Sequence, residues 1–107
     1  MDYSQVVGRI KQVAAHVLPK GSTLYLYGSR ARGEARQDSD WDLLILLDKQ
    51  NIEVSDKDDI VFPFVDLGWE IGEDISARAF TKKQWFEGRH PLFYFNVEND
   101  KQILYES

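Results

Sequence analysis

Two short motifs, close together in the chain, combine residues that favour phosphate binding with residues that favour metal binding. Gly28 and Ser29 directly follow residues 23–27, a β-branched and aromatic run that predicts a strand. Asp40 and Asp42 follow ten residues later, at the start of a second apolar run. A site that handles a metal-bound nucleoside triphosphate needs a phosphate-binding turn beside paired carboxylates. Nucleotide chemistry is therefore the leading hypothesis.

The first motif has the properties of a phosphate-binding turn. Gly28 has no side chain, so a phosphate group can approach the backbone closely there. Ser29 can cap the short helix that follows, and free N–H groups at a helix start bind anions. Arg30, Arg32 and Arg36 add guanidinium groups suited to bidentate phosphate contacts. Alone, a Gly-Ser turn is common and an arginine cluster is usually a solvated face. The phosphate-binding interpretation therefore depends on the nearby carboxylates.

The second motif has the properties of a magnesium site. Side chains alternate along a strand, so Asp40 and Asp42 are expected on one face, with Cα atoms roughly 6–7 Å apart. Trp41 between them then points into the core, and Ser39 either orients a ligand or shapes the loop. Two carboxylates suit one or two Mg²⁺ ions, and two such ions would lie roughly 4 Å apart. Burying unpaired carboxylates at a core strand is costly unless a cation or donor compensates.

The pattern Gly28-Ser29-x10-Asp40-x-Asp42 resembles the signature of the minimal nucleotidyltransferases of the DNA polymerase β-like superfamily, and the resemblance extends over residues 5–105. It implies that Gly28 and Ser29 hold the phosphates of a nucleoside triphosphate, ATP in the first instance, and that Asp40 and Asp42 bind magnesium. It implies an α/β (α+β) fold, with helices packed on one face of a small mixed sheet. Many members of this superfamily are antitoxins paired with a helical HEPN toxin, and some transfer AMP to it, so a HEPN-type partner is expected.

The third carboxylate of the family pattern is less distinct in this sequence. Active members carry an Asp or Glu on the next strand, as the base that activates the acceptor hydroxyl. Asp74 begins the next predicted strand, residues 74–80, with Ser76 and Arg78 on the same face. We expect Asp74 to be the third catalytic and metal-binding carboxylate. Asp66, in a predicted helix, is a weaker candidate.

Two functions of different classes remain open, because the third carboxylate is less distinct here than in the family pattern. The first is a magnesium-dependent nucleotidyltransferase that transfers a nucleoside monophosphate to an acceptor hydroxyl. The second is a catalytically silent antitoxin that neutralises a HEPN protein by contact. A subunit whose nucleotide site is completed by a separate helical chain lies between them.

Bulk properties limit the class of protein. The chain has 107 residues, 43% of them hydrophobic, which predicts one folded domain over residues 1–107. The absence of cysteine excludes disulfides and thiolate metal sites and is consistent with the cytoplasm. A net charge of −5 argues against broad nucleic-acid binding. No apolar run is long enough to span a membrane, and the sequence leaves the oligomeric state open.

Apolar periodicity and capping signals predict the remaining elements. They are a helix over 3–18, a helix over 60–71 interrupted by Pro63, a short helix capped by Thr81 and Gln84, a helix over 91–98 with His90 at its cap, and a last edge strand over 102–105.

Overall fold

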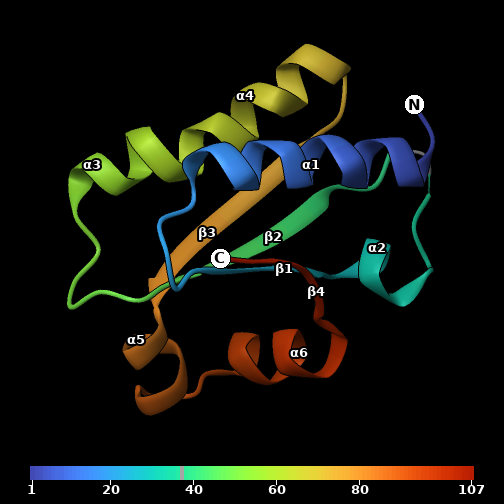
Figure 1. The fold of residues 1–107 in the computed structure, drawn as a ribbon. Helices are drawn as coiled ribbons and strands as arrows, with labels where there is room; N and C mark the ends of the chain where they lie inside the picture. The colour runs from blue at the N-terminus through green and yellow to red at the C-terminus, as the bar shows by residue number, and fades with distance from the viewer. Residues whose placement is uncertain (37) are drawn as a thin grey trace.

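The fold is a mixed four-stranded sheet with helices, seen in a computed structural model that describes residues 1–36 and 38–107 (Figure 1). The elements, in chain order, are α1 (Tyr3–Val17), β1 (Thr23–Tyr27), α2 (Ser29–Arg32), β2 (Trp41–Leu47), α3 (Val54–Asp56), the π-helical turn η1 (Lys57–Val61), α4 (Phe62–Ile71), β3 (Ile75–Thr81), α5 (Lys82–Glu87), α6 (Leu92–Asp100) and β4 (Gln102–Glu106). Among the described residues, no helix is both long and apolar enough to cross a membrane.

The strand order is β3-β2-β1-β4, so β2 and β1 are central and β3 and β4 are the edges. β1 runs antiparallel to both β2 and β4, whereas β2 and β3 are parallel. In this register Asp42 lies opposite Tyr27 on one side and Ser76 on the other. The predicted α/β class with a mixed sheet is confirmed.

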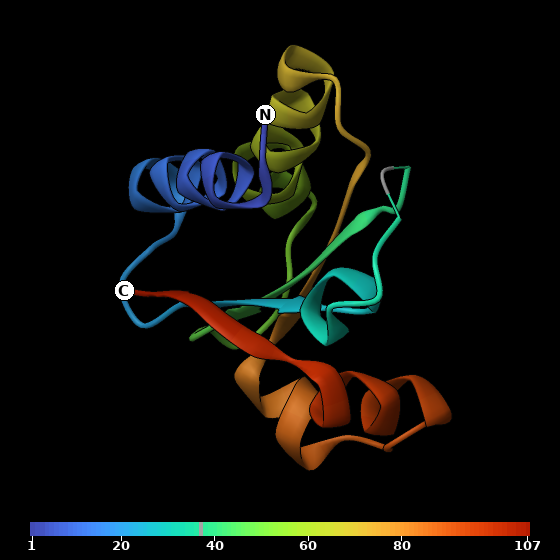
Figure 2. The ribbon, with the colours of Figure 1, turned by 90° about the vertical axis from the view of Figure 1, so that its right-hand side faces the viewer.

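Helices cover both faces of the sheet, and the expectation of helices on one face only was wrong. α1, α3 and α4 lie on one side of the sheet in Figure 1, and α5 and α6 lie on the other; Figure 2 shows the same layers after a quarter turn. The reason lies in β2, which has apolar side chains on both faces. Leu43, Ile45 and Leu47 join the larger core with α1 and α4, while Leu44 and Leu46 pack against Trp85 of α5 and Val97 of α6.

The capping predictions had mixed outcomes. The Thr81–Gln84 capping box is confirmed: the Gln84 N–H donates to the Thr81 hydroxyl and the Thr81 N–H donates to the Gln84 amide oxygen, each at 3.0 Å. Pro63 lies inside a continuous helical segment, because α3, η1 and α4 follow one another without a break. The π-helical turn η1 directly precedes α4, which is where a proline without an N–H would otherwise interrupt the helix. His90 does not cap α6, because Pro91 is the N-cap residue and its ring allows the extended backbone required there.

Candidate active site

The predicted site residues meet at one end of the sheet. Gly28 follows the last residue of β1, Asp42 is the second residue of β2, and Asp74 directly precedes β3. The Trp41 N–H donates to the Asp74 carbonyl at 2.8 Å, which extends the β2–β3 ladder to this end. Two neighbouring segments and a third that is distant in sequence therefore bring their polar residues to the same end of the sheet.

Gly28 packs directly against the carboxylate of Asp42. Its φ of +78° lies in the left-handed region, and a Cβ atom built on it would lie 2.5 Å from Asp42 Oδ2. No side chain fits in that space, so this position requires glycine for both its backbone and its contact. The close approach of the turn to the carboxylate is what a shared phosphate and metal site needs.

The carboxylates of Asp40, Asp42 and Asp74 affect one another electrostatically. The charge of Asp74 raises the pKa of Asp40, and slight desolvation and a hydrogen bond to Asp74 raise it further. Burial raises the pKa of Asp42, and the charge of Asp40 adds to it, while the Arg78 guanidinium lowers it. The protein therefore holds acidic groups close together with incomplete internal compensation.

This cluster has the donor chemistry for magnesium without forming a closed cage. Within residues 1–36 and 38–107, no group of three or more His, Cys, Asp or Glu side chains is arranged to hold a metal ion by itself. Magnesium is usually bound through one or two carboxylates together with substrate phosphates, rather than by an all-protein cage. The Gly28 turn in contact with the Asp42 carboxylate, with Asp40 and Asp74 nearby, is the kind of donor set that mode of binding uses.

Arg30 is held by groups of the protein itself. Its guanidinium donates to the Ser39 carbonyl at 2.9 Å and forms an ion pair with Glu73 at 3.7 Å. It also lies over the Trp41 ring, 4.5 Å from the centroid. Arg30 therefore fixes the loop before β2 against the start of β3, and its phosphate-binding role stays a prediction.

Arg32 and Ser39 also have internal contacts. Arg32 forms ion pairs with Glu34 at 3.0 Å and with Asp100 of α6 at 2.6 Å. The Ser39 hydroxyl accepts from the Arg36 N–H at 2.8 Å, so it shapes the loop, one of the two roles expected for it. Both residues stay predictions as nucleotide ligands.

Arg78 is a site residue whose importance the sequence did not reveal. Its guanidinium lies over the Phe93 ring of α6, 4.7 Å from the centroid, and it lowers the pKa of both Asp42 and Tyr27. Burial, followed by the charge of Asp42, raises the pKa of Tyr27. Alternation along the predicted strand placed Arg78 on the face of Asp74, but the aromatic wall behind it comes from residues distant in sequence.

Comparison with known proteins supports the fold and the family. A family model described as polymerase beta, nucleotidyltransferase matches residues 9–107. A search of curated protein sequences finds no match.

Solved structures with a similar fold include three that are informative. The crystal structure of a toxin–antitoxin complex with AMP-PNP superimposes with a TM-score of 0.68 at 16% identity, covering 94% of this chain and 73% of the other. The MNT antitoxin complex with a tri-AMPylated HEPN toxin from Shewanella oneidensis gives 0.63 at 13% identity, covering 97% and 72%. A putative nucleotidyltransferase from Sulfolobus solfataricus gives 0.65 at 20% identity, covering 95% and 81%. The fold agrees with the family match over nearly the whole chain, and the protein belongs to the polymerase β nucleotidyltransferase family.

Proposed function

We propose that this protein is a magnesium-dependent nucleotidyltransferase that transfers a nucleoside monophosphate, AMP in the first instance, to a hydroxyl group of a HEPN-type partner protein. The observation that carries the proposal is the meeting of Asp40, Asp42 and Asp74 at the glycine turn of Gly28. The similar fold of the antitoxin bound to an AMPylated HEPN toxin supports the choice of partner and of transferred group.

The chain's own residues divide the work as follows. The backbone of Gly28 and Ser29 binds the β- and γ-phosphates, because the turn has no side chain there to keep them away. Asp40 and Asp42 hold magnesium, which orients the attacking oxygen and stabilises the leaving pyrophosphate when bound. Asp74 accepts the proton of the acceptor hydroxyl. A bond forms between that oxygen and the α-phosphorus, and the bond to the bridging oxygen breaks, so its electron pair leaves with pyrophosphate.

The test is transfer of label from α-phosphate-labelled ATP, in the presence of magnesium, to native lysate proteins. The wild type should produce a labelled band. Asp42→Asn should reduce labelling at least about a hundredfold, because the amide lacks the charge that binds magnesium and the reacting groups are then no longer held in position. Asp66→Asn is the matched control, since Asp66 lies on α4 in a hollow beside α1. Full labelling by Asp42→Asn would refute the assignment.

The silent antitoxin is the second candidate, and the exposed outer side of α6 favours it. Leu92 is 75% exposed and Phe95 is 57% exposed, a large apolar surface for one short helix. A double Asp40→Asn, Asp42→Asn variant separates the two candidates. A protein that acts by contact alone still forms the HEPN complex and still protects cells from the toxin, whereas a transferase loses protection.

A further inference from the structure

β3 is an edge strand whose outer backbone groups face away from the sheet. Its one strand neighbour among the described residues is β2. Because the Trp41 N–H donates to the Asp74 carbonyl, and backbone groups alternate along a parallel strand, Ser76 and Arg78 direct their N–H and C=O groups to β2. The corresponding groups of Ala77 and Ala79 point outward. A free edge of this kind is a template for another strand.

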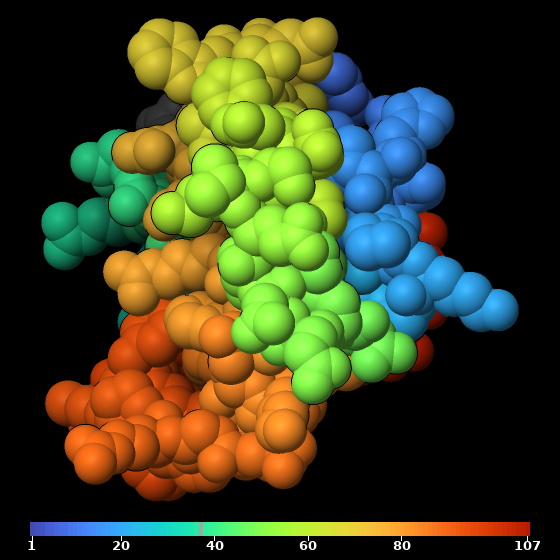
Figure 3. Space-filling view, turned by 90° about the vertical axis from the view of Figure 1, so that its left-hand side faces the viewer, coloured from blue at the N-terminus to red at the C-terminus, as the bar shows by residue number. Residues whose placement is uncertain are grey.

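A groove runs along this edge, beneath the turn η1 and helix α4. Its volume is about 480 Å³, and its walls are formed on one side by Ala77–Phe80 and on the other mainly by apolar residues, which are Ile52, Val61, Phe62 and Val65. Phe62 is 57% exposed, so part of this apolar wall is open to solvent. Figure 3 shows the helical segment, green to olive, running beside the orange residues of β3.

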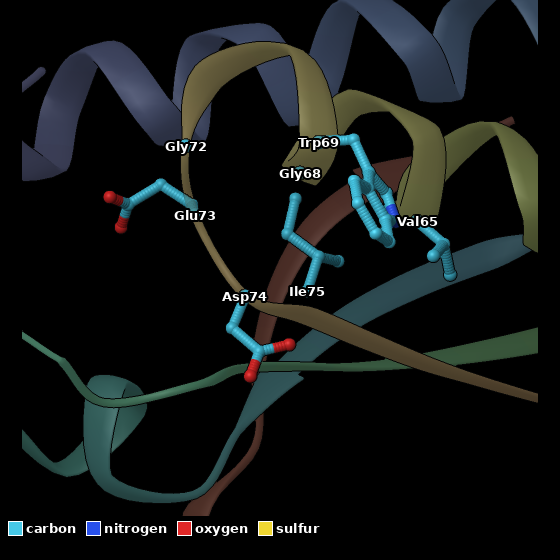
Figure 4. A pocket seen from close by; sticks show the side chains of 7 residues that line it. All are labelled: Val65, Gly68, Trp69, Gly72, Glu73, Asp74 and Ile75. Atoms are coloured by element: carbon cyan, nitrogen blue, oxygen red, sulfur yellow. The ribbon is translucent and has the colours of Figure 1, made fainter.

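The groove leads to the candidate active site. A second hollow of about 360 Å³ shares Val65 with the groove and reaches Asp74. Figure 4 shows Trp69 and Val65 on α4 above Ile75, with Asp74 at the end of the same strand. Trp69 is 84% exposed and adds apolar surface beside this passage. The Asp74 carboxylate points away from α4 in Figure 4, so a strand laid along this edge would have one face in the groove and the other beside Asp74.

The charges along the groove favour an acidic ligand. Lys57 lines it, and Asp58 is the one acidic residue among its lining residues. Arg78 belongs to the strand that forms one wall, and its guanidinium lies on the other face of this edge, over Phe93 of α6 (Figure 1). Within the described parts of the chain, neither Lys57 nor Arg78 forms an ion pair. Phe93 holds the Arg78 guanidinium in place, which leaves its hydrogen-bond donors available to a carboxylate.

We propose that an extended segment of the acceptor protein docks along β3 as a fifth strand, with its accepting hydroxyl beside Asp74 and an acidic side chain against Arg78. This inference rests on the proposed function. The glycine turn lies at β1 and the paired aspartates lie at β2, so the leaving pyrophosphate departs on the β1 side. A nucleophile attacks phosphorus in line with the leaving group, from the opposite side. The β3 side is therefore where the acceptor enters.

The geometry defines the chemistry of that segment. A strand added to an edge lies about 4.8 Å from it, with side chains alternating between the two faces. Asp74 and Arg78 lie on one face, four residues apart, which is roughly 13 Å along a strand. The segment therefore carries a tyrosine, serine or threonine and an acidic residue at the same spacing. Its intervening residues are apolar and fit beneath Phe62 and Val65.

The other edge of the sheet gives the internal comparison. β4 is also an edge strand, and it exposes Ile103 at 55%. None of the hollows described above is lined by residues of β4. A free edge alone therefore does not identify a docking site; β3 differs by its groove, its cations and its continuity with Asp74.

The experiment is amide NMR of the labelled protein with two short synthetic peptides. Each alternates valine with polar residues and carries one tyrosine and one glutamate, four residues apart; the order of these two is reversed in the second peptide, to test both strand directions. We expect one of them to shift the Ala77 and Ala79 amide signals and to protect them from hydrogen exchange, while β4 signals stay unchanged. No change along β3 with either peptide, or a response centred on β4 or α6, would overturn the inference.

Variants test the two kinds of contact separately. Ala79→Pro removes an outward N–H without breaking the ladder to β2 and should weaken peptide binding at least about tenfold; Ala79→Ser keeps the N–H and should bind normally. Arg78→Glu should also weaken binding, and a peptide with lysine in place of glutamate should restore it, whereas Arg89→Glu on the exposed loop before α6 should have no effect. Restoration by neither peptide would refute the role of Arg78.

Two further measurements keep the possible failures apart. A parallel titration with ATP and magnesium reports on Gly28 and Asp42, so peptide docking without nucleotide binding would refute the proposed function but not the docking site. A shift of β3 signals with protein concentration alone would show that a second copy of the chain occupies the edge, and this would overturn the choice of occupant.

Discussion

Carboxylates in two regions of this protein have opposite environments. In α3, Asp56 accepts from the Glu53 N–H at 2.7 Å and from the Lys49 ammonium at 2.9 Å, and these contacts lower its pKa. At the start of β2, burial and the charge of Asp40 raise the pKa of Asp42. Both side chains are partly or fully buried, so burial alone does not explain the difference.

We interpret this difference as one between acids that stabilise the fold and acids whose mutual repulsion only a bound ligand would relieve. A buried carboxylate with donors and a cation stabilises the folded state, whereas adjacent carboxylates repel one another and raise each other's pKa. Asp40 and Asp74 belong to the second kind, since the charge of Asp74 is the main cause that raises the pKa of Asp40. A cation bound there would relieve the repulsion. Perturbed acids that share one sheet end are therefore candidates for function.

The largest effect should come from the glycine that gives Asp42 its space. In Gly28→Ala the new Cβ would lie 2.5 Å from Asp42 Oδ2, so the carboxylate or the turn has to move. A displacement of about 1 Å in a catalytic site costs roughly a hundredfold in rate. We expect nucleotide transfer to fall by about that factor, measured as label incorporated from α-labelled ATP.

Gly33→Ala is the control for the positive φ, because this glycine has a similar φ without the contact to Asp42. Gly33 has a φ of +74°, against +78° for Gly28, but a Cβ there would meet nothing within 4 Å. Gly33→Ala should therefore lose about 1–2 kcal/mol of folding free energy from the left-handed helical conformation. Gly28→Ala should lose more, because its ψ of −159° places this residue in a region that is essentially restricted to glycine. If the two variants lose activity equally, the contact with Asp42 does not matter and the comparison fails.

The sequence was sufficient for the parts of the site that depend on local spacing. Gly28, Asp40 and Asp42 could be placed on neighbouring elements because a strand, a turn and a second strand follow one another between residues 23 and 47. The boundaries of α1 and the capping box of α5 were predictable for the same reason, since both rest on contacts between near neighbours.

Long-range contacts account for what the sequence did not predict. The sequence did not predict that Glu73 and the Ser39 carbonyl bind the Arg30 guanidinium, because the position of Glu73 depends on the β2–β3 pairing. The covering of the second sheet face by α5 and α6 likewise depends on how the chain returns after β3. No local sequence pattern predicts the Arg30 contacts or the covering of the second sheet face.

A smaller effect should come from the structural acid. Asp56 has a folded pKa below its ordinary value of 3.8, so its stabilisation is present in full above that pH and is lost as the pH falls through the folded pKa. Asp56→Asn should lower the free energy of unfolding at pH 7 by about 1–2 kcal/mol, as the loss of a helix-capping acid does.

Urea unfolding at a series of pH values measures the difference in free energy of unfolding between wild type and Asp56→Asn. Wild type and Asp56→Asn should begin to converge near pH 4 and should meet as the pH falls through the folded pKa of Asp56, where the wild-type carboxylate becomes protonated. Asp58→Asn, at an exposed neighbouring position, should follow the wild type throughout. A constant difference between wild type and Asp56→Asn down to strongly acidic pH would show that the charge of Asp56 does not matter.

The smallest effect on folding stability, and the one of opposite sign, should come from Asp42. Its folded pKa is raised, so the folded state binds a proton more tightly and stability falls as the pH rises through the unfolded and then the folded pKa. At pH 7 without divalent metal, Asp42→Asn should therefore raise Tm by a few degrees at most, which corresponds to less than about 1 kcal/mol in a domain of this size.

Magnesium should reverse the order of the two Tm values, because an ion that binds only the folded protein raises the Tm of the wild type and leaves the variant unchanged. Asp56→Asn, with the site intact, should keep the response to magnesium. If Asp42→Asn instead lowers Tm and magnesium has no effect on the wild type, Asp42 is a structural acid like Asp56, and the distinction between the two regions does not hold.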